Sequence, residues 1–338
     1  MKLYSGIDLH SNNSMVVVLN EQDKVILKKK LPNDVDIILA TLEPFKEDLQ
    51  GVAVESTFNW YWLVDALAEA GYSPYLVNTA AVKQYEGLKH TDDQDDAIWL
   101  AHLLRLGILP TGYIYPKERR AIRDLLRKRG QLVRHRTAHI LSIHNLFNRN
   151  TGHRFSCNAI KHIKDEDIEK SFPDDNLVLA MKSNVLMMRA LDNQIKEIEK
   201  VVFAQVKLEP SFRQLLTIAG VGKILALTIM LETGTISRFS SVGDFASYCR
   251  CVGSVKLSNG KKKGVGNKKN GNKYLSWAFV EAANFSVRYS EKAKRFYQRK
   301  MQKTKRVVAI KALAHKLARA SFYIMRDQVA FNPEKLFG

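Results

Sequence analysis

The first hundred residues alternate apolar and polar segments in an order that few folds accommodate. Three strand-like segments come first, at residues 3–9, 14–20 and 24–31, and short polar turns join them. A segment with helical spacing of Leu39, Leu42 and Phe45 follows, then a buried strand at 52–54, a helix at 60–70 and a strand at 75–77. With a further helix after residue 92, the order is βββαβαβα.

This order is that of the ribonuclease-H-like (RuvC-like) fold, a mixed sheet flanked by helices. Asp8 and Glu55 each end an apolar strand, and Asp93 and Asp96 share one helical face because they are three residues apart. Hard cations such as Mg²⁺ take oxygen ligands, and a carboxylate site of this kind suits phosphoryl transfer. The four carboxylates therefore predict a metal site in the α/β domain.

The aspartate run at 92–96 has a second interpretation, since Asp is common at solvated helix starts. The strand-end positions of Asp8 and Glu55 favour the metal site over that interpretation. Asp92 and Asp95 have the same spacing as Asp93 and Asp96, so the register of the run stays open.

The charge of the chain predicts a nucleic-acid partner. Lys and Arg number 53 against 34 Asp and Glu, a net charge of +19, which is typical of proteins that neutralise phosphates. The excess is concentrated in segments, above all in a helix-compatible stretch at 117–150. From this stretch we expect nucleic-acid contacts by Arg119, Arg120, Arg123, Arg127, Lys128 and Arg134.

Two apolar stripes predict a helical middle region. One contains Leu125, Leu132, Ile140 and Phe147; the other contains Leu179, Leu186, Leu191, Ile195 and Ile198. We expect two long helices that pack as a coiled coil within or between chains, with a loop at 151–175 between them. His135 and His139 lack the Glu of a metalloprotease motif, so we expect them to face nucleic acid or solvent.

The last region is expected to be mostly helical and carries two glycine-rich segments. Gly220, Gly222 and Lys223 resemble a helix-hairpin-helix turn that exposes backbone N–H groups to a phosphate, although a tight turn without a ligand explains the same residues. A Gly- and Lys-rich loop follows and contains Ser254 and Ser258. Its composition alone favours phosphate binding over nucleophilic catalysis, with contacts expected from Lys261, Lys268, Lys269 and Lys273.

Six short motifs together resemble the IS-one-ten family of insertion-sequence transposases, in particular the IS-eleven-eleven subgroup. They begin at Gly6, Val54, Asp93, Gly220, Ser258 and Lys269, and their order covers nearly the whole chain. The resemblance implies a RuvC-like domain at 1–115, a basic helical and coiled-coil region at 116–205 and a serine transposase domain at 206–338.

The resemblance also implies a mechanism. Asp8, Glu55, Asp93 and Asp96 would be the DEDD set that holds Mg²⁺ or Mn²⁺, and Ser258 would be the nucleophile. A structured bridge RNA would pair with donor and target DNA. Many relatives have Ser-Ser-Gly where this chain has Ser258, Asn259 and Gly260, so Ser254 remains an alternative. Because strands at two sites must be cut together, we expect a homo-oligomer, either a dimer or a tetramer.

Three other functions share some of these sequence features. A junction-resolving nuclease would need the carboxylates but not Ser258, and a non-catalytic RNA-binding protein would need neither. A sugar kinase of the actin-like fold also opens on Gly6-Ile7-Asp8, but it predicts a second glycine-rich ATP motif and no large basic excess. Only three cysteines occur and no apolar run approaches the ~18 residues of a membrane span. We therefore expect a cytoplasmic, nucleoid-associated protein with no membrane partner.

Overall fold

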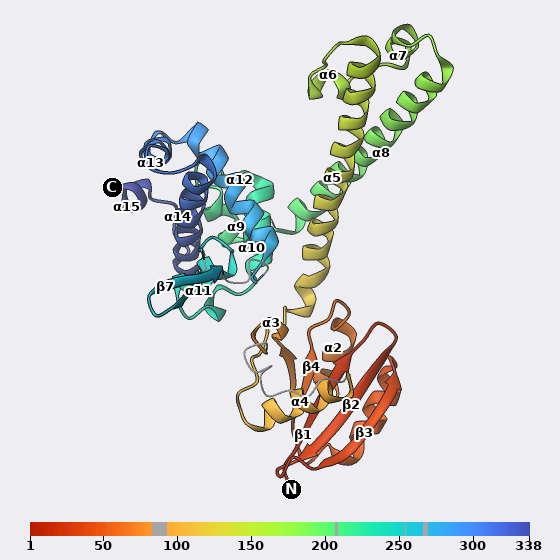
Figure 1. The fold of residues 1–338 in the computed structure, drawn as a ribbon, viewed down its shortest axis with the longest axis vertical. Coiled ribbons are helices and arrows are strands. Elements are labelled where there is room, and N and C mark those ends of the chain that lie inside the picture. The colour runs from red at the N-terminus through yellow and green to blue at the C-terminus, as the bar shows by residue number, and fades with distance from the viewer. Residues whose placement is uncertain (83–92, 207–208, 254, 266–269) are drawn as a thin grey trace. The chain divides into compact units, whose positions relative to one another are not determined.

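The computed structural model describes residues 1–82, 93–206, 209–253, 255–265 and 270–338 (Figure 1). These residues form two compact units, 1–117 and 118–338. None of the described helices has the length and apolar character needed to cross a membrane.

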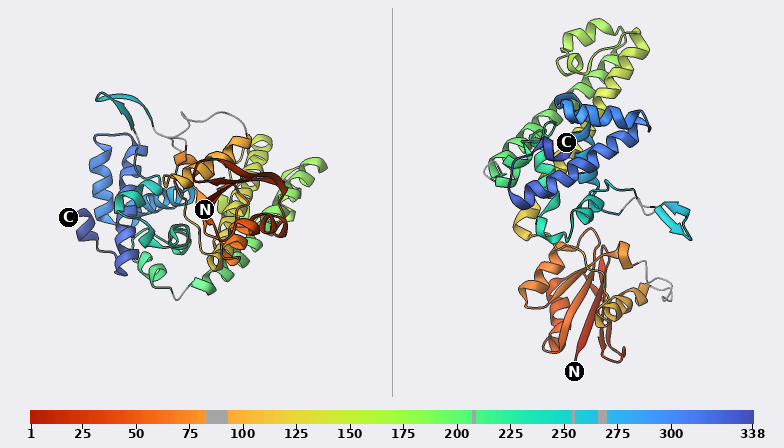
Figure 2. Two further views of the ribbon diagram at one scale, coloured as in Figure 1. Left: turned by 90° about the horizontal axis from the view of Figure 1, so that it is seen from below. Right: turned by 90° about the vertical axis from the view of Figure 1, so that its left-hand side faces the viewer.

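A mixed five-stranded sheet forms the first unit, with strand order β3-β2-β1-β4-β5 (Figures 1 and 2). β1 pairs antiparallel with β2, and β2 with β3, whereas β1, β4 and β5 run parallel. The strands are β1 (Leu3–Leu9), β2 (Asn13–Asn20), β3 (Val25–Pro32), β4 (Leu49–Glu55) and β5 (Pro74–Val77). The edge strand β3 exposes three consecutive lysines at 28–30, which discourage pairing with another sheet.

Helices cover both faces of this sheet. On one face, α1 (Val35–Leu42) and α2 (Tyr61–Glu69) bury Ile38 and Leu63 against β1, β2 and β4. On the other face lies α4 (Asp93–Arg105), while the short α3 (Thr79–Val82) follows β5. Asp34 begins α1 by accepting hydrogen bonds from two backbone N–H groups. Gly71, at φ +84°, follows α2 and lets the chain turn toward β5.

Two long helices begin the second unit, α5 (Lys117–Thr151) and α8 (Asp175–Val206). They are antiparallel, because residues further along α5 contact residues progressively earlier in α8. Arg129 pairs with Glu199 at 2.6 Å, Arg136 pairs with Asp192, and His139 Nδ1 lies 2.9 Å from Asn184 Oδ1. Two short helices, α6 (Cys157–Lys161) and α7 (Asp165–Ser171), connect them and share one apolar cluster with their facing ends.

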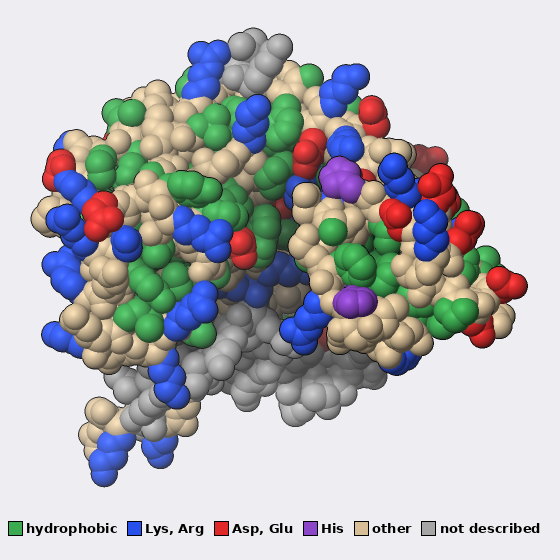
Figure 3. All heavy atoms as spheres, turned by 90° about the horizontal axis from the view of Figure 1, so that it is seen from above, with side chains coloured by type: hydrophobic (Ala, Val, Ile, Leu, Met, Phe, Trp, Pro, Cys, Tyr) green, Lys and Arg blue, Asp and Glu red, His purple; other side chains and the backbone are tan. Residues whose placement is uncertain are grey.

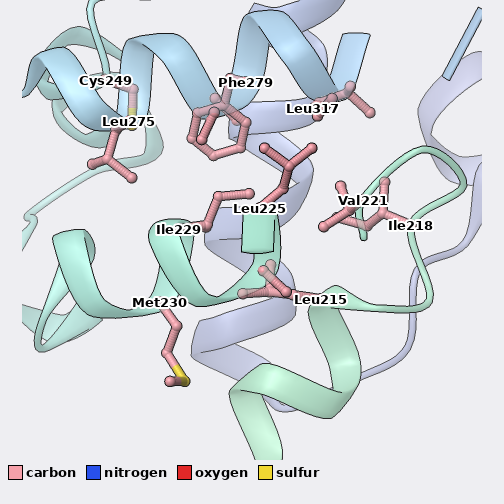
Figure 4. Packing of buried hydrophobic residues seen from close by; sticks show 14 of the residues in the cluster. Leu215, Ile218, Val221, Leu225, Ile229, Met230, Cys249, Leu275, Phe279 and Leu317 are labelled. Carbon is pink, nitrogen blue, oxygen red and sulfur yellow. The ribbon is translucent and has the colours of Figure 1, made fainter. Parts of the chain in front are cut away.

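The rest of the second unit is mostly helical. Its core joins α9 (Pro210–Leu215), α10 (Lys223–Thr233), α11 (Val242–Tyr248), α12 (Lys273–Tyr289), α13 (Glu291–Met301) and α14 (Arg306–Asp327). In the close-up, Leu225 and Ile229 of α10 point toward Phe279 of α12 (Figure 4). The remaining elements are η1 (Glu43–Phe45), η3 (Ile236–Arg238), β6 (Val255–Ser258), β7 (Lys261–Val265) and α15 (Pro333–Phe337).

An α/β N-terminal region followed by a mostly helical remainder is thereby confirmed, but two finer predictions for the middle region are wrong. Residues 151–175 are not a plain loop, since they contain α6 and α7. Leu179 and Leu186 are each 67% exposed, because Met181, Val185 and Met188 form the packed stripe of α8 instead. His135 is exposed, in keeping with its prediction, and the half-buried His139 also contacts Asn184 across the helix pair.

Candidate active site

Asp8 and Glu55 lie at the same edge and on the same face of the sheet. β1 and β4 pair in parallel with Gly6 opposite Ala53 and Ile7 opposite Val54, and both acids come one residue beyond the last of these pairs. Side chains two residues apart on a strand share a face. Asp8 therefore shares the face of Gly6, and Glu55 shares that of Ala53, which packs against α4.

Gly6 is the point at which α4 meets the sheet. A Cβ atom at this position would lie only 2.0 Å from the carbonyl oxygen of Ala97 and 2.8 Å from the backbone N of Ala101. Both alanines are fully buried, so small residues on both sides bring the helix backbone onto the strand. This close approach places the first turn of α4 beside the strand ends.

We expect Gly6→Ala to destabilise the first unit, because the added methyl overlaps backbone atoms that cannot rotate away. Such overpacking costs about 1–3 kcal/mol or more, and urea unfolding followed by circular dichroism measures it. Gly112→Ala is the matched control, since its Cβ would meet nothing closer than 3.4 Å. Equal unfolding midpoints for the two variants would contradict the contact between Gly6 and α4.

The direction of α4 is fixed at its other end by Asp23, in the turn between β2 and β3. Asp23 Oδ1 accepts a hydrogen bond from Arg105 Nε at 2.6 Å and lies 2.8 Å from His102 Nδ1. That turn adjoins the start of β1, because Asn20 pairs with Leu3. The N-terminal turn of α4, with Asp96, therefore lies toward the end of β1 that carries Asp8. The side chains of Asp93 and Asp95, and all of Asp92, fall outside the described residues.

The Asp23 contacts predict a pH dependence of stability. Burial raises the pKa of Asp23, but hydrogen bonds from His102 and Arg105 outweigh it and hold the pKa below the ordinary 3.8. A carboxyl whose folded pKa is depressed stabilises the fold above its unfolded pKa and loses that effect as the pH falls through the folded value. Asp23→Asn should thus be less stable than the parent at neutral pH.

The stability difference between the parent and Asp23→Asn should shrink as the pH falls from about 7 to about 3, measured as the urea midpoints of both proteins. Asn tolerates the left-handed backbone of this position, at φ 59°, so the substitution removes charge without backbone strain. A difference that stays constant down to about pH 3 would show that the Asp23 charge is not involved.

Asp8 is the most constrained of the candidate acids. Its side chain is 2% exposed, and its Oδ2 atom has no hydrogen bond of good geometry among the described residues. Its ion-pair partner among the described residues is His10, whose Nε2 atom lies 3.1 Å from that oxygen on a side chain that is 45% exposed. A buried carboxylate oxygen whose nearest cationic partner is a half-exposed histidine fits a metal ligand, because a buried carboxylate charge needs close compensation.

The described residues alone do not complete a metal site. Within them, no three His, Cys, Asp or Glu side chains are grouped closely enough to hold an ion. Asp8 and Glu55 share an edge, and Asp96 lies on the helix that covers it, but the fourth predicted acid, Asp93, has no described side chain. The donor chemistry fits a divalent cation, and the complete ligand set stays a prediction.

The candidate nucleophile lies on a β-hairpin. Ser258 ends β6 and pairs in register with Lys261, which begins β7. The two residues between them, Asn259 and Gly260, have φ values of 50° and 70°, as a tight type I′ turn requires. The backbone therefore places Ser258 at the tip of the hairpin, while its side chain, all of Ser254, and Lys268 and Lys269 lie outside the described residues.

The two ends of the segment that carries this hairpin are fastened together. The backbone N–H of Asn272 donates to the Tyr248 carbonyl at 2.6 Å, and the Arg250 guanidinium donates to the Gly271 carbonyl at 2.8 and 3.0 Å. Gly271 has φ +84°, and a Cβ there would lie 2.4 Å from the Tyr248 oxygen. Only glycine fits at this crossing, so the hairpin departs from and returns to one point on the helical core.

Most of the arginines predicted to bind nucleic acid are buried or form ion pairs within the protein. Arg119 pairs with Glu209 at 2.6 Å, and Arg127 pairs with Glu232 at 2.6 Å. Arg120 and Arg123 are only 5% and 8% exposed. The exposed cations of the predicted set, among the described side chains, are Lys128 and Arg134 on α5, Lys223 on α10, Lys261 on the hairpin and Lys273 on α12.

The predicted helix-hairpin-helix turn joins α9 to α10. Gly220, at φ +98°, lies against α12, where a Cβ would come 2.4 Å from the backbone N of Ser286. Gly222 is the N-cap residue just before α10, and a Cβ there would have no neighbour within 4 Å. Lys223 Nζ lies 5.6 Å from the Phe203 ring centroid. Packing explains Gly220, whereas Gly222 and Lys223 stay open to a phosphate.

Two models of transposase families match parts of this chain. The model of the DEDD transposases of IS110 elements, described as a transposase, matches residues 5–150. The model of the transposase IS116/IS110/IS902 family matches residues 212–298. Together they cover more than half of the chain. The chain belongs to the IS110 (IS-one-ten) transposase family.

The transposase also resembles a curated protein along its whole length. It is 23% identical over 343 residues to a probable family 20 transposase of Pseudomonas aeruginosa, an alignment that covers 97% of this chain and 98% of the relative. DNA is accordingly a partner of this transposase. On the face drawn in Figure 3, Lys and Arg side chains of the C-terminal helices have few Asp or Glu among them.

Sequence reasoning missed two features of the transposase. Glu232 is 3% exposed, and its carboxylate receives hydrogen bonds from Arg127 and from Asn272 Nδ2 at 2.7 Å, which ties α5 and α10 to the start of α12. Trp277 is 46% exposed on α12, one turn after Tyr274. The spacing of Lys273, Tyr274 and Trp277 just after the lysine-rich segment was the available signal.

Proposed function

We propose that this transposase exchanges DNA strands through a serine nucleophile and a divalent-metal carboxylate site, guided by a bridge RNA. One observation carries the proposal: Asp8 presents a buried carboxylate oxygen, contacted only by the half-exposed His10 among the described ion-pair partners, at the sheet edge it shares with Glu55. A protein that only bound RNA would have no use for such an oxygen.

We infer a ribonuclease-H-like architecture for the first unit. The strand order β3-β2-β1-β4-β5, with β1, β2 and β3 antiparallel and β1, β4 and β5 parallel, supports it. Asp8, Glu55, Asp93 and Asp96 would hold Mg²⁺ or Mn²⁺. When bound, the metal supplies Lewis-acid stabilisation of the charge that develops on the phosphate.

We further propose that Ser258 attacks the DNA. Its Oγ forms a bond to phosphorus as one deoxyribose oxygen leaves, and the serine proton passes to a base while the leaving oxygen gains a proton. A hydroxyl of the incoming strand then attacks the phosphoserine ester and releases Ser258. The hairpin tip suits this step, because a tight turn at 259–260 lets the backbone approach a phosphate closely.

The guide RNA and the oligomer complete the proposal. Exposed Lys128, Arg134 and Lys261 would contact phosphates without reading sequence, and the antiparallel pair of α5 and α8, a coiled coil in this proposal, would mediate contacts between copies. Two DNA sites must be cut together, so a dimer or tetramer is required. A cytoplasmic, nucleoid-associated location follows from this activity.

Reconstitution tests the proposed function. The purified protein is mixed with Mg²⁺, donor and target DNA, and the RNA transcribed from the sequence that flanks its gene. Recombinant DNA should form only when that RNA and the metal are both present. Recombination without RNA would overturn the guided mechanism, and cleavage without joining would favour a junction-resolving nuclease.

A further inference from the structure

A cavity of about 480 Å³ opens among α5, α10 and α12, outside the two sites described above. Its volume is in the range of sites that enclose a small organic group. Gly130 of α5 and Tyr274 and Trp277 of α12 line it, together with the apolar side chains of Leu126, Val133 and Ile224. A flat aromatic ligand could lie against these walls.

The charges at the cavity favour an anion. Arg127 and Arg129 also line it, but Glu232 and Glu199 neutralise them. Lys273 and Arg134 also line the cavity. Neither forms an ion pair with a carboxylate in the part of the chain that the structure describes. Its net field is therefore positive on an apolar and aromatic floor.

The two aromatic side chains have different environments. Arg127 lies 4.7 Å and Lys273 Nζ 5.3 Å from the centroid of the Tyr274 ring, so cations already occupy positions around it. Trp277 is 46% exposed and is the larger ring. Trp277 is therefore the surface on which a ligand can stack.

We propose that this cavity binds one unpaired nucleotide of a nucleic-acid strand, with its base on Trp277 and its phosphate beside Lys273 and Arg134. An aromatic platform with adjacent cations is the means by which proteins hold single strands, because every base has a stacking face. The cavity adjoins Asn272 and Gly271, at which the serine hairpin rejoins the core. A base lifted from its duplex during strand exchange would be held there.

The inference uses the nucleic-acid partner of the family but neither the serine nor the metal chemistry. The strand can be DNA or guide RNA, since both offer a base and a phosphate. Measurements of binding alone therefore separate this inference from the proposed function.

The experiment compares the affinity of the full chain for three labelled probes of one sequence: single-stranded DNA, single-stranded RNA and duplex DNA. Trp277→Ala should weaken binding of a single strand by about 5- to 150-fold, which corresponds to about 1–3 kcal/mol for one stacked base. Duplex binding should change by less than about twofold, because no base is unpaired there. Trp277→Phe should restore part of the affinity.

Gly130 offers a second variant that keeps every charge. A Cβ at Gly130 would meet only Arg134 Nη1, at 3.9 Å, so the helix accepts a side chain there. Gly130→Leu should fill the cavity and cause the same selective loss, whereas Gly130→Ala should bind as the parent does. Both should unfold no earlier than the parent, since glycine within a helix is unfavourable.

The outcomes separate the possibilities. Selective loss for the DNA strand, for the RNA strand or for both would support the proposal and identify the source of the nucleotide. Unchanged single-strand affinity in both Trp277→Ala and Gly130→Leu would overturn the proposal and would favour a protein side chain as the occupant of the cavity. Equal losses for single strands and duplex would overturn it as well.

Discussion

Asp8→Asn is expected to slow strand exchange by about a thousandfold or more, the equivalent of several kcal/mol of lost charge stabilisation. Asp8 is buried at the sheet edge, and an amide carries no charge with which to hold a cation. DNA binding should stay within about twofold, because phosphate contacts by exposed cations dominate affinity. A recombination assay and a gel-shift assay on one protein preparation measure both.

Asp36→Asn is the matched control for Asp8→Asn. Asp36 is exposed in the first turn of α1, so its substitution removes the same charge from the same unit without touching the sheet edge. It should leave recombination unchanged. Near-parental recombination by a folded Asp8→Asn protein would remove Asp8 from the metal site, and a lowered melting temperature would mark a structural role instead.

Ser258→Ala is expected to lower recombination by about ten-thousandfold or more, because a methyl group cannot replace a nucleophilic hydroxyl. The protein should remain folded, since Ser258 lies at the tip of a hairpin and not in the core. A metal-dependent nuclease that uses water would retain its cleavage in this variant. Denaturing gels and mass spectrometry of protein trapped on nicked DNA would locate the linked serine.

Ser254→Ala serves as the control for Ser258→Ala and as the test of the alternative nucleophile. It lies in the same Gly- and Lys-rich segment and removes the same hydroxyl. Loss of activity in Ser254→Ala alone would move the nucleophile to Ser254. Full activity in both variants would contradict a covalent serine mechanism.

The first unit could be predicted from sequence because its signals are local. The predicted strand at 3–9 coincides with β1, and the predicted helix at 60–70 differs from α2 by one residue at each end. Alternation along β1 also determines which residues share a face. These patterns were enough to place Asp8 at the end of a strand and to place Glu55 at the same edge of the sheet.

The role of the basic helix could not be predicted, because it depends on partners far away in the chain. Arg127 meets Glu232 105 residues later, and Arg119 meets Glu209 90 residues later. A run of arginines has the same composition whether carboxylates or phosphates neutralise it. Reversing the charge of Arg127 would therefore place two negative groups together and disturb the core, so Lys128 and Arg134 are the better probes of binding.

Because α5 and α8 pair antiparallel, the length of this helix pair can change only in discrete steps. Seven residues inserted into each helix at the same level would extend it by about 10 Å, at 1.5 Å per residue. The faces would stay nearly in phase, since seven residues are close to two turns. An insertion of two or five would instead rotate Ile140 and Ile143 out of their apolar cluster with Met188. Relatives in which this helix pair is longer or shorter should therefore differ by multiples of seven residues in both helices. Such changes would move α6 and α7 along the axis of the pair while the packing at both of its ends stays the same.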